Sequence, residues 1–125
     1  PPGGGGGGGG QEYTDTTPPG HPNNFVALPA DKQITLKWNN PTDSDFSKVQ
    51  LLRKEGSYPT SHNDSLARII YQGRSEQYVD TGLNNSTTYY YAIYALDNNY
   101  NYSNSSTAFL QPGQDQKQVI GQSSV

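Results

Sequence analysis

The chain contains no cysteine and no methionine among its 125 residues. Without a thiol it forms no disulfide, binds no metal through thiolates and has no cysteine nucleophile. Its stability must therefore come from packing alone. The absence of both sulfur side chains also removes the most readily oxidised groups, which is compatible with a protein that works outside the cell.

Charged residues and long apolar runs are also scarce. Eight Lys and Arg stand against 11 Asp and Glu, which gives a net charge of −3 and a pI near 5.1. Basic residues are not clustered with aromatic ones, as binding to nucleic acid would require, so we expect no nucleic-acid partner. No apolar run approaches the roughly 20 residues of a membrane-spanning helix, so we also expect no membrane span.

Residue types that support catalysis are few and scattered. The two histidines, His21 and His62, are separated by several predicted strands and loops, and we expect both to be solvent-exposed bystanders. Asp43 and Asp45, in the segment PTDSDF, are close enough to share a cation. Short acidic side chains also cap backbone amides in ordinary turns between strands, and this second interpretation is preferred.

One segment has part of a calcium-loop pattern. Asp97, Asn99 and Asn101 occupy alternate positions, like the first three ligands of such a loop. However, Tyr102 stands where the sharp turn needs glycine, and Ala108 stands where a bidentate glutamate is needed. We therefore expect no catalytic, cofactor-binding or metal-binding residues, so the protein is predicted not to be an enzyme and to need no cofactor.

Composition divides the chain into three parts. Residues 1–21 form a Pro/Gly-rich lead-in that begins PPGGGGGGGG, and the composition predicts a flexible or polyproline II-like and polyglycine II-like segment. Residues 22–111 contain the apolar pattern of a folded domain, and residues 112–125 form a polar tail. An ordered glycine run would need partners for its backbone groups, which bundled copies from neighbouring chains could supply.

Within residues 22–111 apolar side chains recur at every second position, as in ITLKW and TTYYYAIYALD. Turn-forming pairs such as Asn39-Asn40 and Thr81-Gly82 separate these runs. This pattern predicts an all-β, antiparallel sandwich of about seven strands. The residues expected in its core are Ile34, Leu36, Trp38, Val49, Leu51, Leu83, Tyr89, Tyr91, Ile93 and Ala95.

Several segments together resemble a fibronectin type III domain of the microbial extracellular kind. They are DTTPPG, ITLKWNNP, RKEGSYPTS, IIYQG, DTGL and GLNNSTTYYYAIYALD, and the similarity covers about residues 15–110. The resemblance implies an immunoglobulin-like sandwich with Trp38 in its core. It also implies that Tyr89 is the tyrosine-corner residue, with its hydroxyl bonded to loop backbone near Leu83.

Domains of this family serve as spacers, adhesive modules or structural repeats, so the resemblance implies a non-catalytic structural or adhesive role, extracellular or at the cell surface. We expect a subunit of a surface filament or layer that assembles through its flanks, with copies of itself or neighbouring modules as protein partners. The alternative is a spacer or carbohydrate-binding accessory module of a secreted polysaccharide-degrading enzyme. Fold alone does not decide between them.

Two groups of surface residues are candidates for binding or modification. Exposed tyrosines offer flat area to a glycan or a protein, although tyrosine is also common on the outer face of any sheet. The candidates are Tyr90, Tyr94, Tyr100 and Tyr102. Five N-x-S/T triplets fall in predicted loops, and they are glycan acceptors only if the source glycosylates asparagine. They begin at Asn63, Asn84, Asn85, Asn101 and Asn104.

Overall fold

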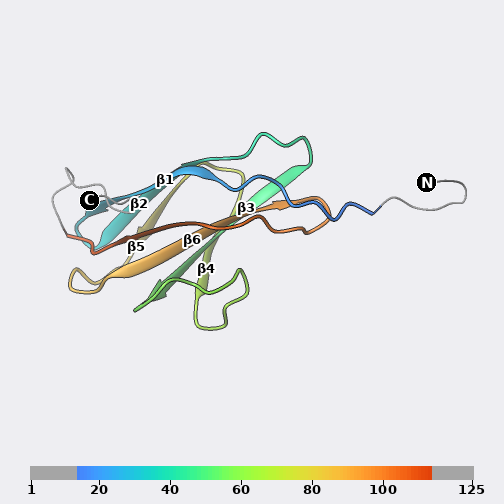
Figure 1. Cartoon of the computed structure of the whole chain (residues 1–125). Coiled ribbons are helices and arrows are strands. Elements are labelled where there is room, and N and C mark those ends of the chain that lie inside the picture. Colours follow the sequence, from blue (N-terminus) through green and yellow to red (C-terminus); the bar gives the residue numbers. More distant parts are fainter. Residues whose placement is uncertain (1–13, 114–125) are drawn as a thin grey trace, which may run out of the picture.

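The computed structural model describes residues 14–113, which form a sandwich of two antiparallel sheets (Figure 1). The first sheet has the strand order β1-β2-β5, with β1 at Asn23–Ala30, β2 at Gln33–Asn39 and β5 at Gln77–Thr81. The second has the order β4-β3-β6-β7, with β4 at Arg68–Gly73, β3 at Phe46–Glu55, β6 at Tyr89–Asp97 and β7 at Ser106–Leu110. The predicted all-β sandwich of about seven strands is thus confirmed. Among the described residues no helix is long and apolar enough to cross a membrane.

The inward-facing side chains of both sheets pack into one buried cluster. Period-two alternation along β2 puts Ile34, Leu36 and Trp38 on the face toward the other sheet, where each is almost fully buried. All ten residues expected in the core lie in this cluster. The other buried members are Phe25, Ala27, Phe46, Ala108 and Leu110.

The turn before β6 is held by a tyrosine hydroxyl. Tyr89, the first residue of β6, is buried, and its hydroxyl oxygen accepts a hydrogen bond of 2.9 Å from the backbone N–H of Asn84. The backbone N–H of the adjacent Leu83 bonds to the carbonyl of Lys32 at 3.0 Å, which ties this turn to the β1–β2 turn. The hydroxyl of Tyr89 therefore bonds to loop backbone one residue after Leu83.

A loop covers the outer face of the four-stranded sheet. Residues 56–67, between β3 and β4, fold back over β3 and β6, where Leu52, Ala92 and Tyr94 form a second buried cluster. The loop is fastened by the side chain of Gln50, which donates to the carbonyl of His62 at 2.8 Å. The Lys54 ammonium and the Asp64 carboxylate add an ion pair of 2.8 Å. As a result β6 is buried along nearly its whole length.

The chain enters and leaves the sandwich at opposite ends (Figure 1). At the entry, the Asn101 side chain donates to the carbonyl of Asp15 at 2.9 Å. At the exit, the backbone N–H of Gly113 donates to the carbonyl of Ala30 at 2.8 Å. The β3–β6 register, which runs from Phe46↔Asp97 to Glu55↔Tyr89, separates these two ends by the length of the strands.

Candidate functional site

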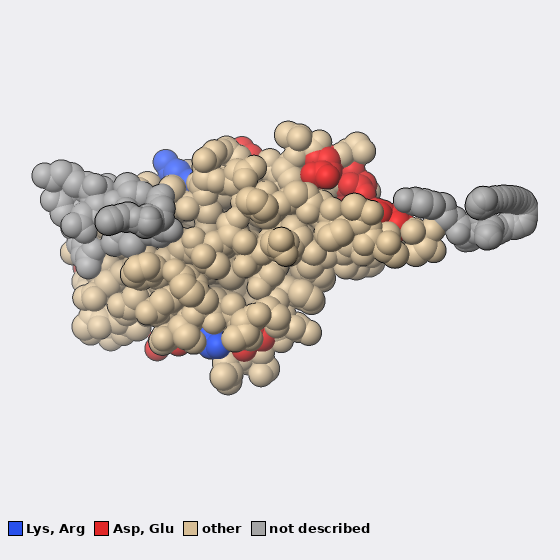
Figure 2. Space-filling view, viewed as in Figure 1, with Lys and Arg blue, Asp and Glu red and all other residues tan. Residues whose placement is uncertain are grey.

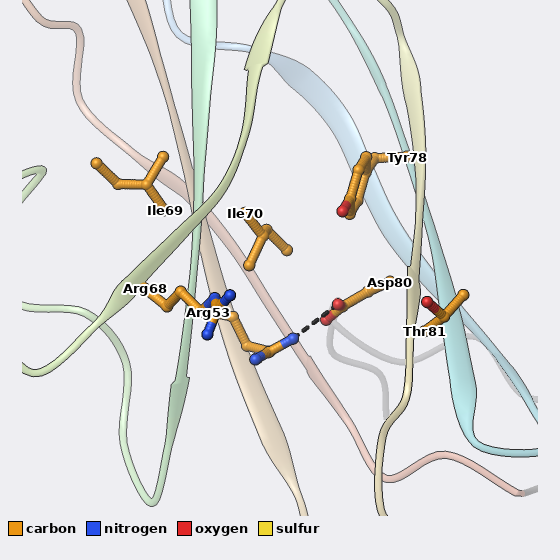
Figure 3. Close-up of a pocket in the computed structure, with 7 residues that line it drawn as sticks. All are labelled: Arg53, Arg68, Ile69, Ile70, Tyr78, Asp80 and Thr81. Carbon is orange, nitrogen blue, oxygen red and sulfur yellow. Dashed lines mark hydrogen bonds and ion pairs between the residues drawn. The ribbon is translucent and has the colours of Figure 1, made fainter.

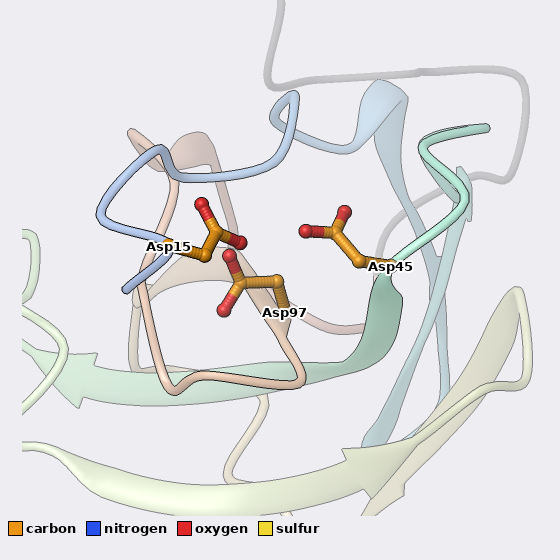
Figure 4. A group of neighbouring side chains, drawn as sticks. All are labelled: Asp15, Asp45 and Asp97. Atoms are coloured by element: carbon orange, nitrogen blue, oxygen red, sulfur yellow. The ribbon is translucent and has the colours of Figure 1, made fainter. Parts of the chain in front are cut away.

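Three carboxylates meet where the lead-in contacts the sandwich (Figure 4). Asp15 comes from the lead-in, Asp45 from the loop before β3 and Asp97 from the end of β6. One oxygen of each lies within 4.8 Å of the others, and Asp97 is buried while the other two are half-buried. Within residues 14–113, these three carboxylates are the acidic side chains that lie close enough to one another to hold a cation.

The oxygens of Asp97 already have donors from their own loop. One accepts hydrogen bonds from the backbone N–H groups of Asn99 and Asn101, both at 2.9 Å, and the other accepts from the Asn101 side chain at 2.9 Å. Burial acts to raise the pKa of Asp97, but these hydrogen bonds outweigh it and lower the pKa. Asn99 and Asn101 are thus donors to Asp97. The alternate spacing of these three residues forms a hydrogen-bonded turn.

Asp45 behaves in the opposite way. A hydrogen bond with the Asp15 carboxyl, together with burial, raises the pKa of Asp45. The folded protein therefore holds a proton on Asp45 more tightly than a free aspartate would, and a proton there reduces repulsion among the three acids. The neighbouring Asp43 lies apart from this group and accepts a hydrogen bond of 3.1 Å from the backbone N–H of Gly20. The absence of a metal site stays a prediction.

Replacing Asp45 with asparagine is expected to raise the melting temperature at pH 7. Because the folded state raises the pKa of Asp45, its charged form costs stability once the pH exceeds that pKa, and asparagine removes the charge. The gain should vanish in acid, where the wild-type carboxyl is neutral in both states. Thermal denaturation followed by circular dichroism at both pH values, in chelator, measures the difference. Asp43→Asn, which alters a charge in the same loop, is the matched control.

The same pair of proteins tests the expectation of no metal site. Calcium added at constant ionic strength should leave both melting temperatures unchanged. If calcium stabilises the wild type but not Asp45→Asn, the three carboxylates bind it and the expectation is wrong.

The four tyrosines chosen as a binding surface do not form one surface. Tyr94 is only 7% exposed, because the β3–β4 loop covers it, and this differs from the expected exposed position. Tyr102 is half-buried under the same loop and stacks on the His62 ring, with centroids 3.5 Å apart. Tyr100 is 76% exposed but lies beyond the far end of β6 from Tyr90. His62 is therefore a packing residue.

Tyr90 instead belongs to an aromatic group that the sequence analysis did not identify. Its ring stacks on Phe109 of β7, directly opposite in the register, with centroids 5.7 Å apart. Tyr58, from the β3–β4 loop, meets Tyr90 edge-on at 5.0 Å. Tyr58 and Phe109 remain exposed. In the sequence, the segment STAFL places Phe109 on the outward face of its strand, and this position could have indicated the aromatic group.

The asparagines of the N-x-S/T triplets differ in whether their side-chain nitrogen is free. The nitrogen of Asn85 donates to Asp31 at 2.8 Å, and that of Asn101 donates to Asp15 and Asp97. A glycan on either nitrogen would remove these bonds. Within residues 14–113 the side-chain nitrogens of the other three have no hydrogen-bond partner, and all three residues are exposed. They are Asn63, Asn84 and Asn104.

A buried polar group joins the two sheets and was also not foreseen. Arg53 on β3 donates to one oxygen of Asp80 on β5 at 2.7 Å, and the Tyr91 hydroxyl on β6 donates to the other at 2.8 Å. Burial, and then the Asp80 charge, raise the pKa of Tyr91 far above its usual range, so the hydroxyl keeps its proton and remains a donor. In the sequence, alternation places the charged Arg53 on the inward face of its strand, and a charge at such a position needs a buried partner.

Comparison with known proteins gives a likeness of fold alone. No protein-family model and no curated protein sequence matches the chain. Among solved structures, the FN1–FN3 domains of chicken CNTN1 match with a TM-score of 0.66 and 16% identity, over 82% of this chain and 35% of that one. A fibronectin-type-III-like protein of Clostridium thermocellum matches with a TM-score of 0.58 and 23% identity, over 79% and 98%.

A third likeness is to an enzyme. The spore cortex lytic enzyme SleM of Clostridium perfringens matches with a TM-score of 0.60 and 15% identity, over 76% of this chain and 29% of that one. The chain thus spans about a third of the CNTN1 fragment and less of SleM. Three observations indicate the same fold. They are the two sheets in the orders β1-β2-β5 and β4-β3-β6-β7, the hydrogen bond of the Tyr89 hydroxyl, and the likeness to these solved structures. The chain has the fibronectin type III fold.

Proposed function

We propose that the chain is a non-catalytic structural or adhesive module that works outside the cell or at its surface, as one unit of an in-line series. The observation that carries the proposal is that the chain enters and leaves at opposite ends, with contacts to the sandwich at both. A module built in this way passes a pull or a fixed spacing from the segment before it to the segment after it.

Contacts at the entry make the described end of the lead-in, residues 14–21, part of the module. Besides the bond between Asn101 and Asp15, the backbone N–H of Gly20 bonds to Asp43. The Ser106 hydroxyl at the start of β7 donates to the carbonyl of Pro22, and Pro22 is buried. These contacts support a defined direction for residues 14–22 relative to the sandwich.

Contacts at the exit have the same character. The Gln111 side chain donates to the carbonyl of Asn85 at 2.8 Å, and Gly113 bonds to Ala30. Pro112 between them is buried. The module therefore keeps its contacts with the chain for the three described residues beyond β7, which suits a rigid link more than a loose one.

The side chains that could perform chemistry support a non-catalytic role. The Nδ1 of His21 lies 2.9 Å from the Pro22 carbonyl and 3.2 Å from the Ser106 hydroxyl, while His62 is stacked on Tyr102. The carboxylate of Asp80 is fully bonded to Arg53 and Tyr91. None of these groups combines a nucleophile with a base in the manner of a hydrolase.

In the finer form of the proposal, copies of the chain assemble through their flanks into a filament or layer, with copies or neighbouring modules as partners. Residues 1–13 and 114–125 lie outside the described residues, so the support is compositional. Gly3 to Gly10 have no side chains to pack, and rods of this composition are stable when neighbouring chains satisfy their backbone groups.

Deleting Pro1 to Gly10 is expected to abolish oligomers while leaving the domain intact. Residues 14–113 already contain both sheets and the buried core, so the circular dichroism spectrum and melting temperature should match those of the full chain. Sedimentation velocity over a range of concentrations measures the assembly. A truncated chain that assembles like the full chain would show that the flank is only a tether.

The second candidate function is a spacer or carbohydrate-binding accessory module of a secreted polysaccharide-degrading enzyme. Two observations favour it: the likeness to part of SleM, and the exposed rings of Tyr58 and Phe109 beside Tyr90. Co-sedimentation with insoluble polysaccharides tests it. Binding that is lost in Phe109→Ala, in a chain that stays monomeric, would make this candidate the better one.

A further inference from the structure

A hollow opens at the side of the sandwich, between the edge strands β4 and β5 (Figure 3). Its volume is about 300 Å³, at the small end of the range for ligand pockets. It is separate from the carboxylate group and from the aromatic group around Tyr90. Its lining residues are Arg53, Arg68, Ile69, Ile70, Tyr78, Asp80 and Thr81.

Two arginines face one another in this hollow. Arg53 and Arg68 are direct partners in the register of β3 and β4. Figure 3 shows their guanidinium groups side by side, with Arg53 also reaching toward Asp80. Like charges directly opposite on neighbouring strands destabilise a sheet. The pairing is therefore a local cost that a negative charge between the two groups would offset.

The carboxylate already in the hollow does not neutralise both arginines. One oxygen of Asp80 is bonded to Arg53 and the other to the Tyr91 hydroxyl, and Asp80 is only 3% exposed. Within residues 14–113, Arg68 makes no ion pair and its side chain makes no hydrogen bond. The hollow thus contains two positive groups, one negative group and several free N–H donors.

The charged side chains beside the hollow do not neutralise Arg68. An adjoining hollow is lined by Lys54, Glu55 and Arg68 among others. Lys54 is paired with Asp64. Glu55 is exposed, and no oxygen of it lies within 4.0 Å of either guanidinium in the described part of the chain. Arg68 remains the cation without a partner.

We propose that this hollow binds a carboxylate, held by the guanidinium of Arg68 and by the N–H groups of Arg53 that Asp80 leaves free. A guanidinium presents two parallel donors that match the two oxygens of a carboxylate. The Thr81 hydroxyl supplies a further donor, and the accessible lining of the hollow is almost entirely polar, as a site for a charged carboxylate requires. Binding relieves the repulsion between the two strands and does not depend on assembly through the flanks.

The test is a titration of the isotope-labelled full chain with sodium acetate, against sodium chloride at the same ionic strength, followed by nuclear magnetic resonance. Acetate should produce saturable shifts at the Arg68 and Arg53 side-chain N–H groups and at the Thr81 amide, and chloride should not. Arg68→Gln should weaken acetate binding about tenfold or more, because it removes the bidentate charged donor. Lys37→Gln removes one exposed positive charge on β2, outside the hollow, and should bind acetate like the wild type.

A second readout does not need the ligand. Without acetate, Arg68→Gln should melt at the same temperature as the wild type or higher, since the variant relieves the repulsion with Arg53. Acetate shifts that persist in Arg68→Gln, or shifts that chloride reproduces, would overturn the proposal. Sodium sulfate is the third arm, and binding of sulfate as tight as that of acetate would overturn the assignment to a planar carboxylate.

Discussion

Replacing Trp38 with alanine is expected to lower the free energy of unfolding by about 3 to 5 kcal/mol. Trp38 is 2% exposed and belongs to the core cluster. Its ring meets Phe25 edge-on at 6.3 Å and Tyr71 at 6.2 Å, so the substitution opens a cavity between β1, β2 and β4. Its indole N–H donates to Asn40 at 2.9 Å, and this bond is lost as well.

A loss of this size is a large share of the roughly 5 to 15 kcal/mol that stabilises a typical domain. Urea denaturation followed by fluorescence of the tyrosines or by circular dichroism measures it, because the variant has no tryptophan left. Leu66→Ala, at a side chain that is 78% exposed, is the control and should change little. A Trp38→Ala midpoint close to that of wild type would mean that the β2 register is wrong.

Replacing Arg53 with methionine is expected to cost about 3 kcal/mol or more, because it leaves the Asp80 carboxylate buried with the Tyr91 hydroxyl as its remaining donor. The guanidinium also lies 5.6 Å from the centre of the Tyr89 ring, so a favourable cation–π contact is lost. Methionine keeps much of the apolar stem, and the loss therefore reports mainly on the charge.

The double variant Arg53→Met, Asp80→Leu separates a buried charge from a general packing defect. Replacing both members of a buried ion pair by apolar side chains is often close to neutral, whereas removing one is costly. Urea denaturation of wild type, both single variants and the double variant should therefore show the double variant recovering most of the stability that Arg53→Met loses. A double variant less stable than Arg53→Met would contradict the role given to Asp80.

Sequence patterns anticipate the part of the fold that depends on local alternation. ITLKW places three large apolar side chains on one face of a strand, and a strand with one buried face leaves little freedom in its register. The resemblance of the GLNNSTTY segment to the fibronectin type III family likewise implies a tyrosine whose hydroxyl bonds back to the preceding turn, and the structure has that bond at Asn84. The Tyr89 bond joins residues that are close in the sequence, and the buried face of β2 follows from a single period-two alternation.

Coverage of the outer face could not be anticipated in the same way. Alternation assigns Tyr94 to the face away from the core, and it does lie there beside Leu52. Alternation does not tell whether a loop returns over that face. The loop does so because Gln50 and Lys54, which also point outward from β3, bind His62 and Asp64 of residues 56–67. Such contacts join residues 10 and 12 positions apart.

The group formed by Asp15, Asp45 and Asp97 escaped prediction for a related reason. Each acid comes from a different segment, and the lead-in was expected to precede the folded domain without a defined position on it. The bond from Asn101 to the Asp15 carbonyl joins residues 86 positions apart. Only the topology, which brings the β2–β3 loop, the β6–β7 loop and the lead-in to one end, places the three side chains together (Figure 4). Figure 2 shows acidic side chains gathered at that end of the visible face.

The most direct test of the structural role is electron microscopy, by negative stain, of the full chain and of the chain lacking Pro1 to Gly10, at matched concentrations. An assembling module predicts regular filaments or layers for the full chain and separate particles for the truncated one. Separate monomers in both preparations, at every concentration at which the protein stays in solution, would contradict assembly through the flanks.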